Sequence, residues 1–158
     1  MSPQGHLITT VAACAAVYAV SSSLPLTAGV AMGGFLIDLD HYFDYVVFDR
    51  QFSLDPFRFI RYYENCECRR VVLFLHSYEL MSILALISLL TGSRWLAGYL
   101  LGAAMHLTFD IIFNGQHSLR RPVHFYSFFY RRRHGFLASR LLNVRWKEGL
   151  GEALPHEI

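Results

Sequence analysis

Residues 7–37 form a run of 31 residues without a single Asp, Glu, Lys or Arg. Two shorter stretches, 80–93 and 95–109, are also free of charged side chains. A bilayer is crossed by a helix of about 20 predominantly apolar residues, and only 16% of this chain is charged, against roughly 25% in soluble domains. These runs predict an integral membrane protein, with a very apolar soluble helical bundle as the alternative.

The first run is long enough for two short spans. Residues 21–25, Ser-Ser-Ser-Leu-Pro, are typical of a turn, and they predict one helix at about 6–23 and a second at about 26–44. Further spans fit about 72–92 and about 95–114. We therefore expect an all-α fold, an integral membrane bundle of about four transmembrane helices. Residues 1–115 would form this membrane domain, with a cytoplasmic loop at about 45–70, and residues 116–158 a basic, aromatic interfacial tail.

The distribution of Lys and Arg predicts the orientation. Four spans place the loop and both termini on one side, and 13 of the 14 basic residues fall there. Only Arg94, in the turn between the last two spans, lies opposite. Cytoplasmic loops carry the excess of Lys and Arg, so we expect both termini in the cytoplasm. Topology thus accounts for the arginines, and nucleic-acid binding is disfavoured.

The first predicted span contains a possible targeting signal, and two of the three cysteines lie in the predicted loop. Residues 11–14, Val-Ala-Ala-Cys, resemble a lipoprotein cleavage box, but no Lys or Arg precedes them, so we expect the first span to be retained. Cys66 and Cys68 lie in the predicted loop. In a reducing compartment they are expected to be incidental thiols, with a metal-binding pair as the alternative.

Few ionisable groups interrupt the apolar spans, and an ionisable group in a membrane segment is a functional hypothesis by default. They lie near the predicted cytoplasmic ends of the four spans: His6; Asp38, Asp40, His41 and Asp44; His76 and Glu79; His106 and Asp110. Imidazole and carboxylate are ligands of zinc, manganese and iron. Taken singly, each residue could end a helix or bond within the core; at one common depth, they predict a metal centre.

Helical spacing supports this prediction locally. His106 and Asp110 are four residues apart, so their side chains project about 40° from each other. His76 and Glu79, three apart, also share a face. The four acidic and histidine side chains of residues 38–44 would spread over about 160° of an ideal helix. Either the helix frays there, or the group serves two metals and the residues that support their ligands.

Small residues predict which helices touch. Gly29 and Gly33 are four apart on the second predicted helix, and Gly98 and Gly102 are four apart on the fourth. Such pairs let transmembrane helices approach closely. If both pairs face inward, the contact brings the acidic and histidine side chains of the two helices together.

The ordered motifs resemble a known family. An early His, then Asp38-Leu39-Asp40-His41, His76-Ser77, and His106 with Asp110, is similar to the membrane-bound metal-dependent hydrolase family, small inner-membrane proteins of bacteria and archaea distantly similar to zinc-dependent phospholipase C. The resemblance covers about residues 5–115 and implies an all-helical membrane fold with hydrolytic activity. Carried over by position, it implies one to three divalent ions, zinc first and manganese or iron next, with these ligands: His6, Asp38, His41, His76, His106 and Asp110.

A mechanism follows as an expectation. A metal would activate water near neutral pH. Glu79 would be the general base, and the alternative for Glu79 is a structural hydrogen bond. Asp40 would join the catalytic groups as a second-metal or supporting carboxylate, and Asp44 would have the same role. A site at the cytoplasmic headgroup level favours a phosphoester of a lipid or lipid-linked substrate.

The tail contains an aromatic and basic segment. Residues 123–130 are rich in aromatics and flanked by arginines, which is typical of an interfacial anchor, with phosphate binding as the alternative; His117, His124 and His134 are not assigned to the metal. The rival is a non-enzymatic metal-binding membrane protein: a scaffold, an accessory subunit or a small permease. We favour an enzyme because a transport path needs ionisable groups in both halves of the bilayer.

Overall fold

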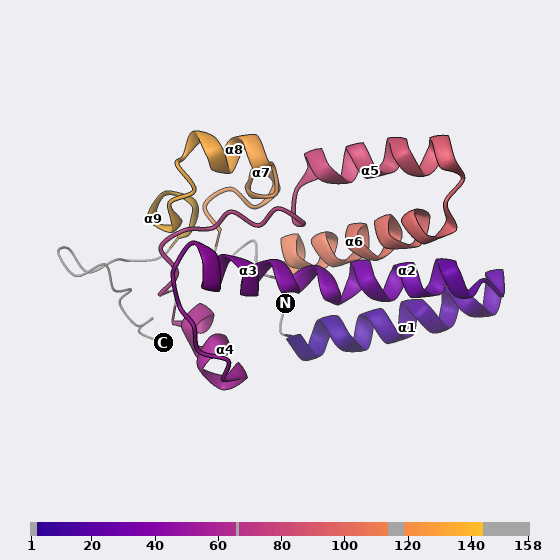
Figure 1. Cartoon of the computed structure of the whole chain (residues 1–158), viewed down its shortest axis with the longest axis horizontal. Helices are drawn as coiled ribbons and strands as arrows, with labels where there is room; N and C mark the ends of the chain where they lie inside the picture. Colours follow the sequence, from indigo (N-terminus) through magenta and orange to yellow (C-terminus); the bar gives the residue numbers. More distant parts are fainter. Residues whose placement is uncertain (1–2, 66, 114–118, 144–158) are drawn as a thin grey trace.

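The computed structural model describes residues 3–65, 67–113 and 119–143, and every regular element in these ranges is helical. Four helices lie side by side as a bundle, with α2 and α6 between α1 and α5 (Figure 1). The helices of this bundle are α1 (Pro3–Ser21), α2 (Leu24–Gly34), α5 (Tyr78–Thr91) and α6 (Arg94–Phe113).

Shorter helices gather at one end of the bundle and form what we call the end lobe (Figure 1). They are α3 (Leu39–Val47), α4 (Pro56–Glu64), α7 (Pro122–Phe125), α8 (Phe128–Arg133) and α9 (Ala138–Leu141), and the short 3₁₀ helix η1 (Leu36–Asp38) joins α2 to α3. The helical class is therefore confirmed for the described residues.

Within the described residues, two helices are long and apolar enough to cross a membrane, Gln4–Ser21 within α1 and Arg94–Phe113. They agree with the predicted spans 6–23 and 95–114. The turn predicted between α1 and α2 is also present, with Ser22 at a φ of 48° and Ser23 as the extended residue before α2. The other two bundle helices, α2 and α5, are apolar but shorter.

The predicted helix at 26–44 is wrong, because the chain breaks after Gly34. The imidazole Nδ1 of His106 lies 3.0 Å from the carbonyl oxygen of Gly34, the acceptor that the next helical turn needs. Two consecutive glycines, Gly33 and Gly34, also weaken the helix there. The chain continues as η1 and then as α3, which redirects residues 39–47 into the end lobe.

The predicted helix at 72–92 is wrong in its first turns. Residues 71–77 are not helical, and α5 begins at Tyr78, where the side chain of Ser77 accepts the backbone N–H of Leu80. The cause is a set of buried side chains that take the backbone groups of this segment, as described below.

The boundary expected at residue 115 does not separate two units. The buried core of the end lobe combines residues from both sides of it, such as Tyr45 and Leu107 with Phe125 and Leu141. The described part of the tail, 119–143, is therefore folded onto the rest of the chain and is more than an interfacial anchor. Isolated bridges join Arg70 to Leu137 and Leu119 to Leu142.

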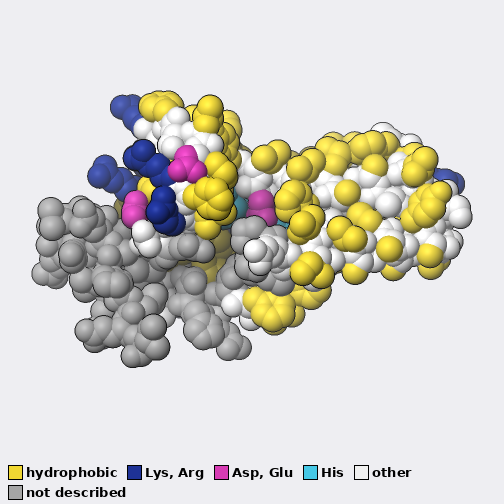
Figure 2. Space-filling model, turned by 90° about the horizontal axis from the view of Figure 1, so that it is seen from below, with side chains coloured by type: hydrophobic (Ala, Val, Ile, Leu, Met, Phe, Trp, Pro, Cys, Tyr) yellow, Lys and Arg dark blue, Asp and Glu magenta, His cyan; other side chains and the backbone are white. Residues whose placement is uncertain are grey.

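Charge and apolar surface are separated along the molecule. The bundle exposes large apolar side chains such as Val20, Leu24, Leu89 and Leu90. Figure 2 shows hydrophobic side chains spread over the bundle and most of the visible Lys and Arg side chains on the end lobe.

The predicted contact between the glycine pairs is present. A Cβ built on Gly29 or Gly33 would overlap the backbone of Trp95 or Tyr99, and one built on Gly98 or Gly102 would overlap carbonyl oxygens of α2. Backbone meets backbone, so no side chain fits between α2 and α6 at these positions. The two helices that flank the polar cluster therefore pack as one unit.

The glycine contact makes a prediction. Gly98→Val places a side chain against backbone that cannot move aside, and overpacking of this kind costs about 1–3 kcal/mol or more. The control is Ala97→Val, at the exposed residue directly before Gly98. Thermal unfolding in detergent should show a lower Tm for Gly98→Val alone; equal Tm values for the two variants would contradict the close contact.

Candidate metal centre

The six residues predicted as ligands lie together where the bundle meets the end lobe. They come from five places in the chain: His6 from α1, Asp38 from η1, His41 from α3, His76 from the segment 71–77, and His106 and Asp110 from α6. Helix α6 presents two of them because four residues make about one turn.

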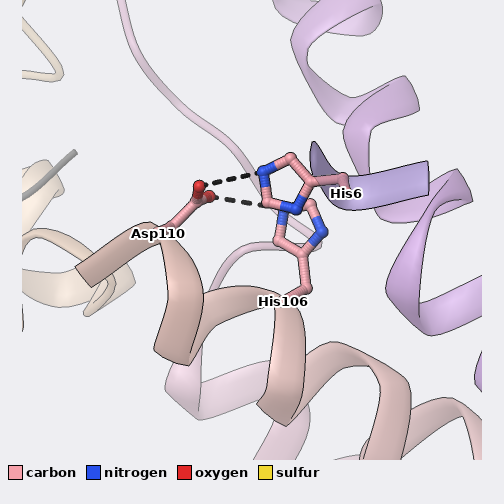
Figure 3. Close-up of side chains that lie close together, drawn as sticks. All are labelled: His6, His106 and Asp110. Carbon is pink, nitrogen blue, oxygen red and sulfur yellow. Dashed lines mark hydrogen bonds and ion pairs between the residues drawn. The ribbon is translucent and has the colours of Figure 1, made fainter. Parts of the chain in front are cut away.

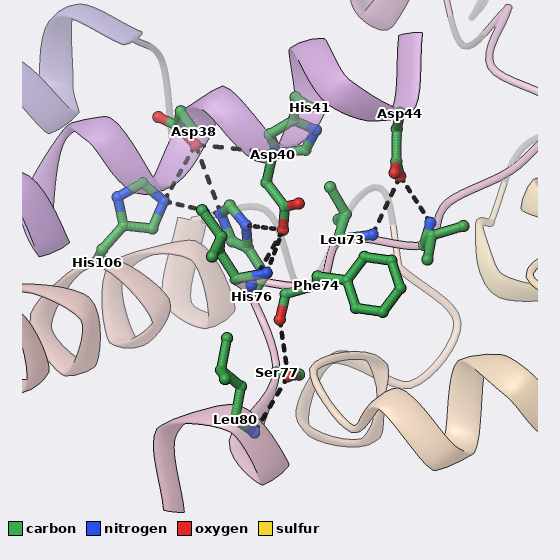
Figure 4. A network of polar contacts seen from close by, with 12 residues as sticks. Asp38, Asp40, His41, Asp44, Leu73, Phe74, His76, Ser77, Leu80 and His106 are labelled. Atoms are coloured by element: carbon green, nitrogen blue, oxygen red, sulfur yellow. Dashed lines mark hydrogen bonds and ion pairs between the residues drawn. The ribbon is translucent and has the colours of Figure 1, made fainter. Parts of the chain in front are cut away.

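Three of these residues form a compact triangle (Figure 4). The Nε2 atoms of His76 and His106 are 3.3 Å apart. The Oδ1 atom of Asp38 lies 3.3 Å from Nε2 of His106 and 3.5 Å from Nε2 of His76. Both imidazoles are completely buried, whereas the Asp38 side chain is 33% exposed. The triangle is thus closed on the protein side and open at the carboxylate.

A second group shares His106 with the first (Figure 3). The two oxygens of Asp110 divide between histidines: Oδ1 lies 3.1 Å from Nε2 of His6, and Oδ2 lies 3.3 Å from Nε2 of His106. The His6 and His106 rings stack with centroids 3.8 Å apart. Because one imidazole nitrogen binds one ion, His106 Nε2 can serve only one of the two groups at a time.

His41 lies at the open side. Its Nε2 atom is 3.9 Å from Oδ1 of Asp38, and its side chain is 30% exposed. Its ring packs edge-on against His76 and Tyr63, and its buried Nδ1 atom has no hydrogen-bond partner among the described residues. Figure 2 shows histidine and acidic side chains reaching the surface at this junction.

The Nδ1 contacts of His76 and His106 determine the tautomer of each ring and therefore the state of its Nε2 atom. His106 Nδ1 faces the carbonyl oxygen of Gly34 at 3.0 Å, and His76 Nδ1 faces Oδ2 of Asp40 at 3.3 Å. Both partners accept hydrogen bonds, so each Nδ1 carries a proton and donates it. In the neutral rings each Nε2 then presents a lone pair, beside the carboxylate of Asp38. Such a cluster of electron pairs could hold a metal ion, and a proton on one of the Nε2 atoms would satisfy the same contacts.

Asp40 and Asp44 support the segment that carries His76, which agrees with the supporting role expected of them as one alternative. Both are buried in α3, and both accept backbone N–H groups of the segment 71–77 (Figure 4). Oδ2 of Asp44 accepts from Val72 and Leu73, and Oδ2 of Asp40 accepts from Leu75 and His76. The carboxylate of Asp40 orients His76 through both its backbone and its ring, while a direct catalytic role of Asp40 stays a prediction.

The carbonyl groups of the same segment are held by one arginine from the tail. Arg131, in α8, is 0% exposed. Its guanidinium donates to the carbonyl oxygens of Val72, Leu73 and His76, at 3.0, 2.8 and 3.2 Å, and to that of Phe125 at 2.6 Å. Arg131 therefore fixes from one side the chain that Asp40 and Asp44 fix from the other.

Burial shifts the pKa values of Asp44 and Arg131, but both side chains stay mainly charged at neutral pH. Burial raises the pKa of Asp44 to about 6, against the two N–H bonds that lower it. Burial also lowers the pKa of Arg131 to about 10, against the nearby carboxylates that raise it. The segment is thus held between a negative and a positive group.

Glu79 is hydrogen-bonded to the beginning of α8. Its Oε1 accepts the Ser127 hydroxyl at 2.6 Å, and its Oε2 accepts the backbone N–H of Phe128 at 2.8 Å. The carboxylate thereby ties the first turn of α5 to the beginning of α8. These contacts agree with the structural alternative for Glu79, and its role as a general base stays a prediction.

The other histidines and cysteines considered from the sequence are not part of the described ligand groups. His124 is exposed, His134 bonds the carbonyl oxygen of Tyr130, and Cys68 is buried in the core of the end lobe. Cys66 and His117 lie outside the described residues. Sequence reasoning missed Arg131, because the run 131–133 has the same basic character as an interfacial anchor.

The chain was compared with known proteins. No family model, no curated protein and no solved structure matches it. The metal-dependent hydrolase family therefore stays an expectation from the motifs.

The role of Arg131 can be tested by a change that keeps its charge. Arg131→Lys removes the planar fork and leaves at least one of the four buried carbonyls without a charged donor, so the free energy of unfolding should fall by about 2–4 kcal/mol. Arg132→Lys, on the exposed neighbour, is the matched control. Denaturant unfolding in detergent measures both, and an unaffected Arg131→Lys protein would rule out the fixation of the segment by Arg131.

Proposed function

We propose that the protein is a membrane-embedded hydrolase whose His and Asp cluster binds a divalent metal ion and cleaves a phosphoester of a lipid or lipid-linked substrate. The observation that carries the proposal is the triangle of Asp38 Oδ1, His76 Nε2 and His106 Nε2, with edges of 3.3–3.5 Å. No described lysine or arginine lies in this triangle to neutralise it.

The spacing of these atoms suits a small divalent ion. Zinc bonds of 2.0–2.1 Å in tetrahedral geometry place neighbouring ligand atoms about 3.3 Å apart, which matches the measured edges. Three protein ligands with a fourth position free are typical of catalytic zinc, whereas structural zinc sites are closed by four. The partly exposed Asp38 carboxylate gives such a fourth position access to the surface.

The support for a membrane location is the separation of surfaces along the molecule. The apolar windows of α1 and α6 are only 11% and 33% buried, so these helices are not the shielded core of a soluble fold. We propose that α2 and α5, packed beside them, complete four spans. The arginines of the end lobe then lie on the cytoplasmic side of an inner membrane, and the cluster lies at headgroup level.

The division of labour within the chain follows from these contacts. A bound ion supplies activated water and polarises an ester oxygen. Asp38, His76 and His106 would hold it, Asp110 and His6 contact His106, and Asp40 keeps the His76 ring in the tautomer that offers Nε2. His41, at the open side, is placed to contact a substrate that approaches past Asp38.

Metal binding is the first test. His106→Ala removes the residue common to both ligand groups, so metal content measured by elemental analysis of detergent-purified protein should fall to background. His124→Ala, which removes an exposed histidine, should leave the content unchanged. A metal-loaded wild type should also lose thermal stability on chelation, since a ligand that binds only the folded state stabilises it. Equal metal content in both variants would exclude this centre.

Turnover is the second test. Metal-loaded wild type should hydrolyse a generic phosphodiester or phosphomonoester, and Asp38→Asn should lower kcat by at least about tenfold because it removes a charged ligand. Full metal occupancy in the wild type without turnover on soluble or lipid phosphoesters would favour the rival, a non-enzymatic metal-binding membrane protein.

A further inference from the structure

We propose that α4 and the loop before it lie in the headgroup layer of an anionic lipid bilayer. Three apolar side chains, Phe52, Leu54 and Phe57, enter the membrane, and we call them the apolar tip. Arg58 and Arg61 contact the lipid phosphates. This surface rests on the proposed membrane location and adds to it a contact outside the spans, in a segment that the sequence placed in a cytoplasmic loop.

The apolar tip is unusually exposed for large apolar side chains. Phe52, Leu54 and Phe57 are 75%, 83% and 73% exposed, and they lie within six consecutive residues. The opposite face of α4 packs normally, since Phe59 and Tyr62 lie against the core of the end lobe. Single apolar side chains on a surface are ordinary, whereas a group of them marks a contact surface.

The backbone holds the apolar tip away from the core. Arg50, with a φ of 54°, turns the chain shortly after α3, and the N–H of Gln51 bonds back to the carbonyl oxygen of Tyr45 at 3.0 Å. Asp55 caps α4, because its side chain accepts the backbone N–H of Phe57 at 2.9 Å. Hydrogen bonds therefore fix the chain on both sides of Phe52 and Leu54.

The end lobe separates apolar from charged side chains in the same direction as the whole molecule. On the face seen in Figure 2, its hydrophobic side chains lie mainly toward the bundle, and its Lys and Arg side chains lie mainly away from it. Helix α4 lies to one side of the long axis of the bundle (Figure 1). A bilayer that surrounds the bundle therefore meets this part of the lobe at its surface, and the apolar tip continues the apolar surface of the spans.

The charges around the apolar tip favour anionic lipid. Arg50, Arg58 and Arg61 are exposed, and no salt bridge joins them to another residue in the part of the chain that the structure describes. Asp55 is the single acidic residue of 50–61. Aromatic side chains beside arginines are typical of interfacial segments, and each basic residue adds to the attraction of an anionic leaflet.

The other face of α4 contacts the cluster. Tyr63 donates its hydroxyl to the carbonyl oxygen of His41 at 2.6 Å, and its ring packs edge-on against the His41 ring with centroids 5.1 Å apart. His41 lies at the open side of the cluster. An interfacial α4 therefore sets the depth at which this side opens, at the level where lipid headgroups arrive.

Fluorescence quenching by lipid tests the apolar tip. The full chain is reconstituted into vesicles of phosphatidylcholine and phosphatidylglycerol whose acyl chains carry bromine near the headgroup. Phe57→Trp is combined with replacement of both native tryptophans, Trp95 and Trp146, by Phe. Its fluorescence should fall at least about twofold relative to vesicles without bromine, as expected of an interfacial side chain. The control is Ser139→Trp in the same background, at an exposed residue of α9, and its fluorescence should not change.

The native Trp95 separates this surface from the membrane location. Trp95 is 47% exposed at the beginning of α6, so in the Trp146→Phe protein it should be quenched if α6 spans the bilayer. Quenching of Trp95 without quenching at residue 57 overturns the interfacial surface and leaves the spans. Absence of quenching at both positions overturns the surface together with the membrane location. None of these measurements requires metal or turnover, so hydrolysis is tested separately.

Two further outcomes would also overturn the proposal. Equal quenching at residues 57 and 139 would mean that the end lobe meets lipid without a particular surface. Protection of residue 57 from acrylamide without quenching by brominated lipid would mean that a protein, either a second copy or another chain, covers the apolar tip.

The arginines are tested in the same assay. Arg58→Gln with Arg61→Gln should lower the quenching at residue 57 about twofold in vesicles that contain phosphatidylglycerol and leave it unchanged in pure phosphatidylcholine. Arg140→Gln, at an exposed arginine of α9, is the control and should change neither. Unchanged quenching in the anionic vesicles, or an equal loss in both kinds, overturns the assignment of anionic lipid.

Discussion

The candidate centre depends on a stretch of chain that has no secondary structure of its own. Backbone polar groups in an apolar setting must find partners within the protein, and residues 72–76 find them in side chains rather than in a helix or a sheet. Asp40 and Asp44 take the N–H groups, and Arg131 takes the carbonyls. These hydrogen bonds fix the segment that carries His76 and so hold its imidazole at 3.3 Å from His106.

A second constraint sets the other half of the cluster. The glycines of α2 and α6 bring the two backbones into direct contact, and His106 reaches across this contact to the carbonyl of Gly34. The same hydrogen bond orients the imidazole and ends α2. One interaction therefore fixes a ring orientation and also releases Asp38 from the helix, so that its carboxylate can turn toward both histidines.

The sequence predicted those features that depend on local pattern. Charge-free runs located α1 and α6, the spacing of Gly29, Gly33, Gly98 and Gly102 located the close contact, and the scarcity of ionisable groups selected the cluster. It could not reveal that α2 stops at Gly34 or that α5 starts at Tyr78, since the causes are side chains distant in the sequence. For the same reason Glu79 and Asp40 looked free for catalysis, and Arg131 looked like one of three surface arginines.

The position of Arg131 in the chain has a consequence for biogenesis. Segments emerge from the ribosome in order, and N-terminal parts tend to fold first, so α1 to α6 are made before the guanidinium that holds residues 72–76 exists. Until α8 emerges, the carbonyls of this segment lack their partner and His76 lacks a fixed position. Completion of the cluster is thus coupled to the synthesis of α8, and a nascent chain that ends before α8 carries the other candidate ligands without a fixed His76.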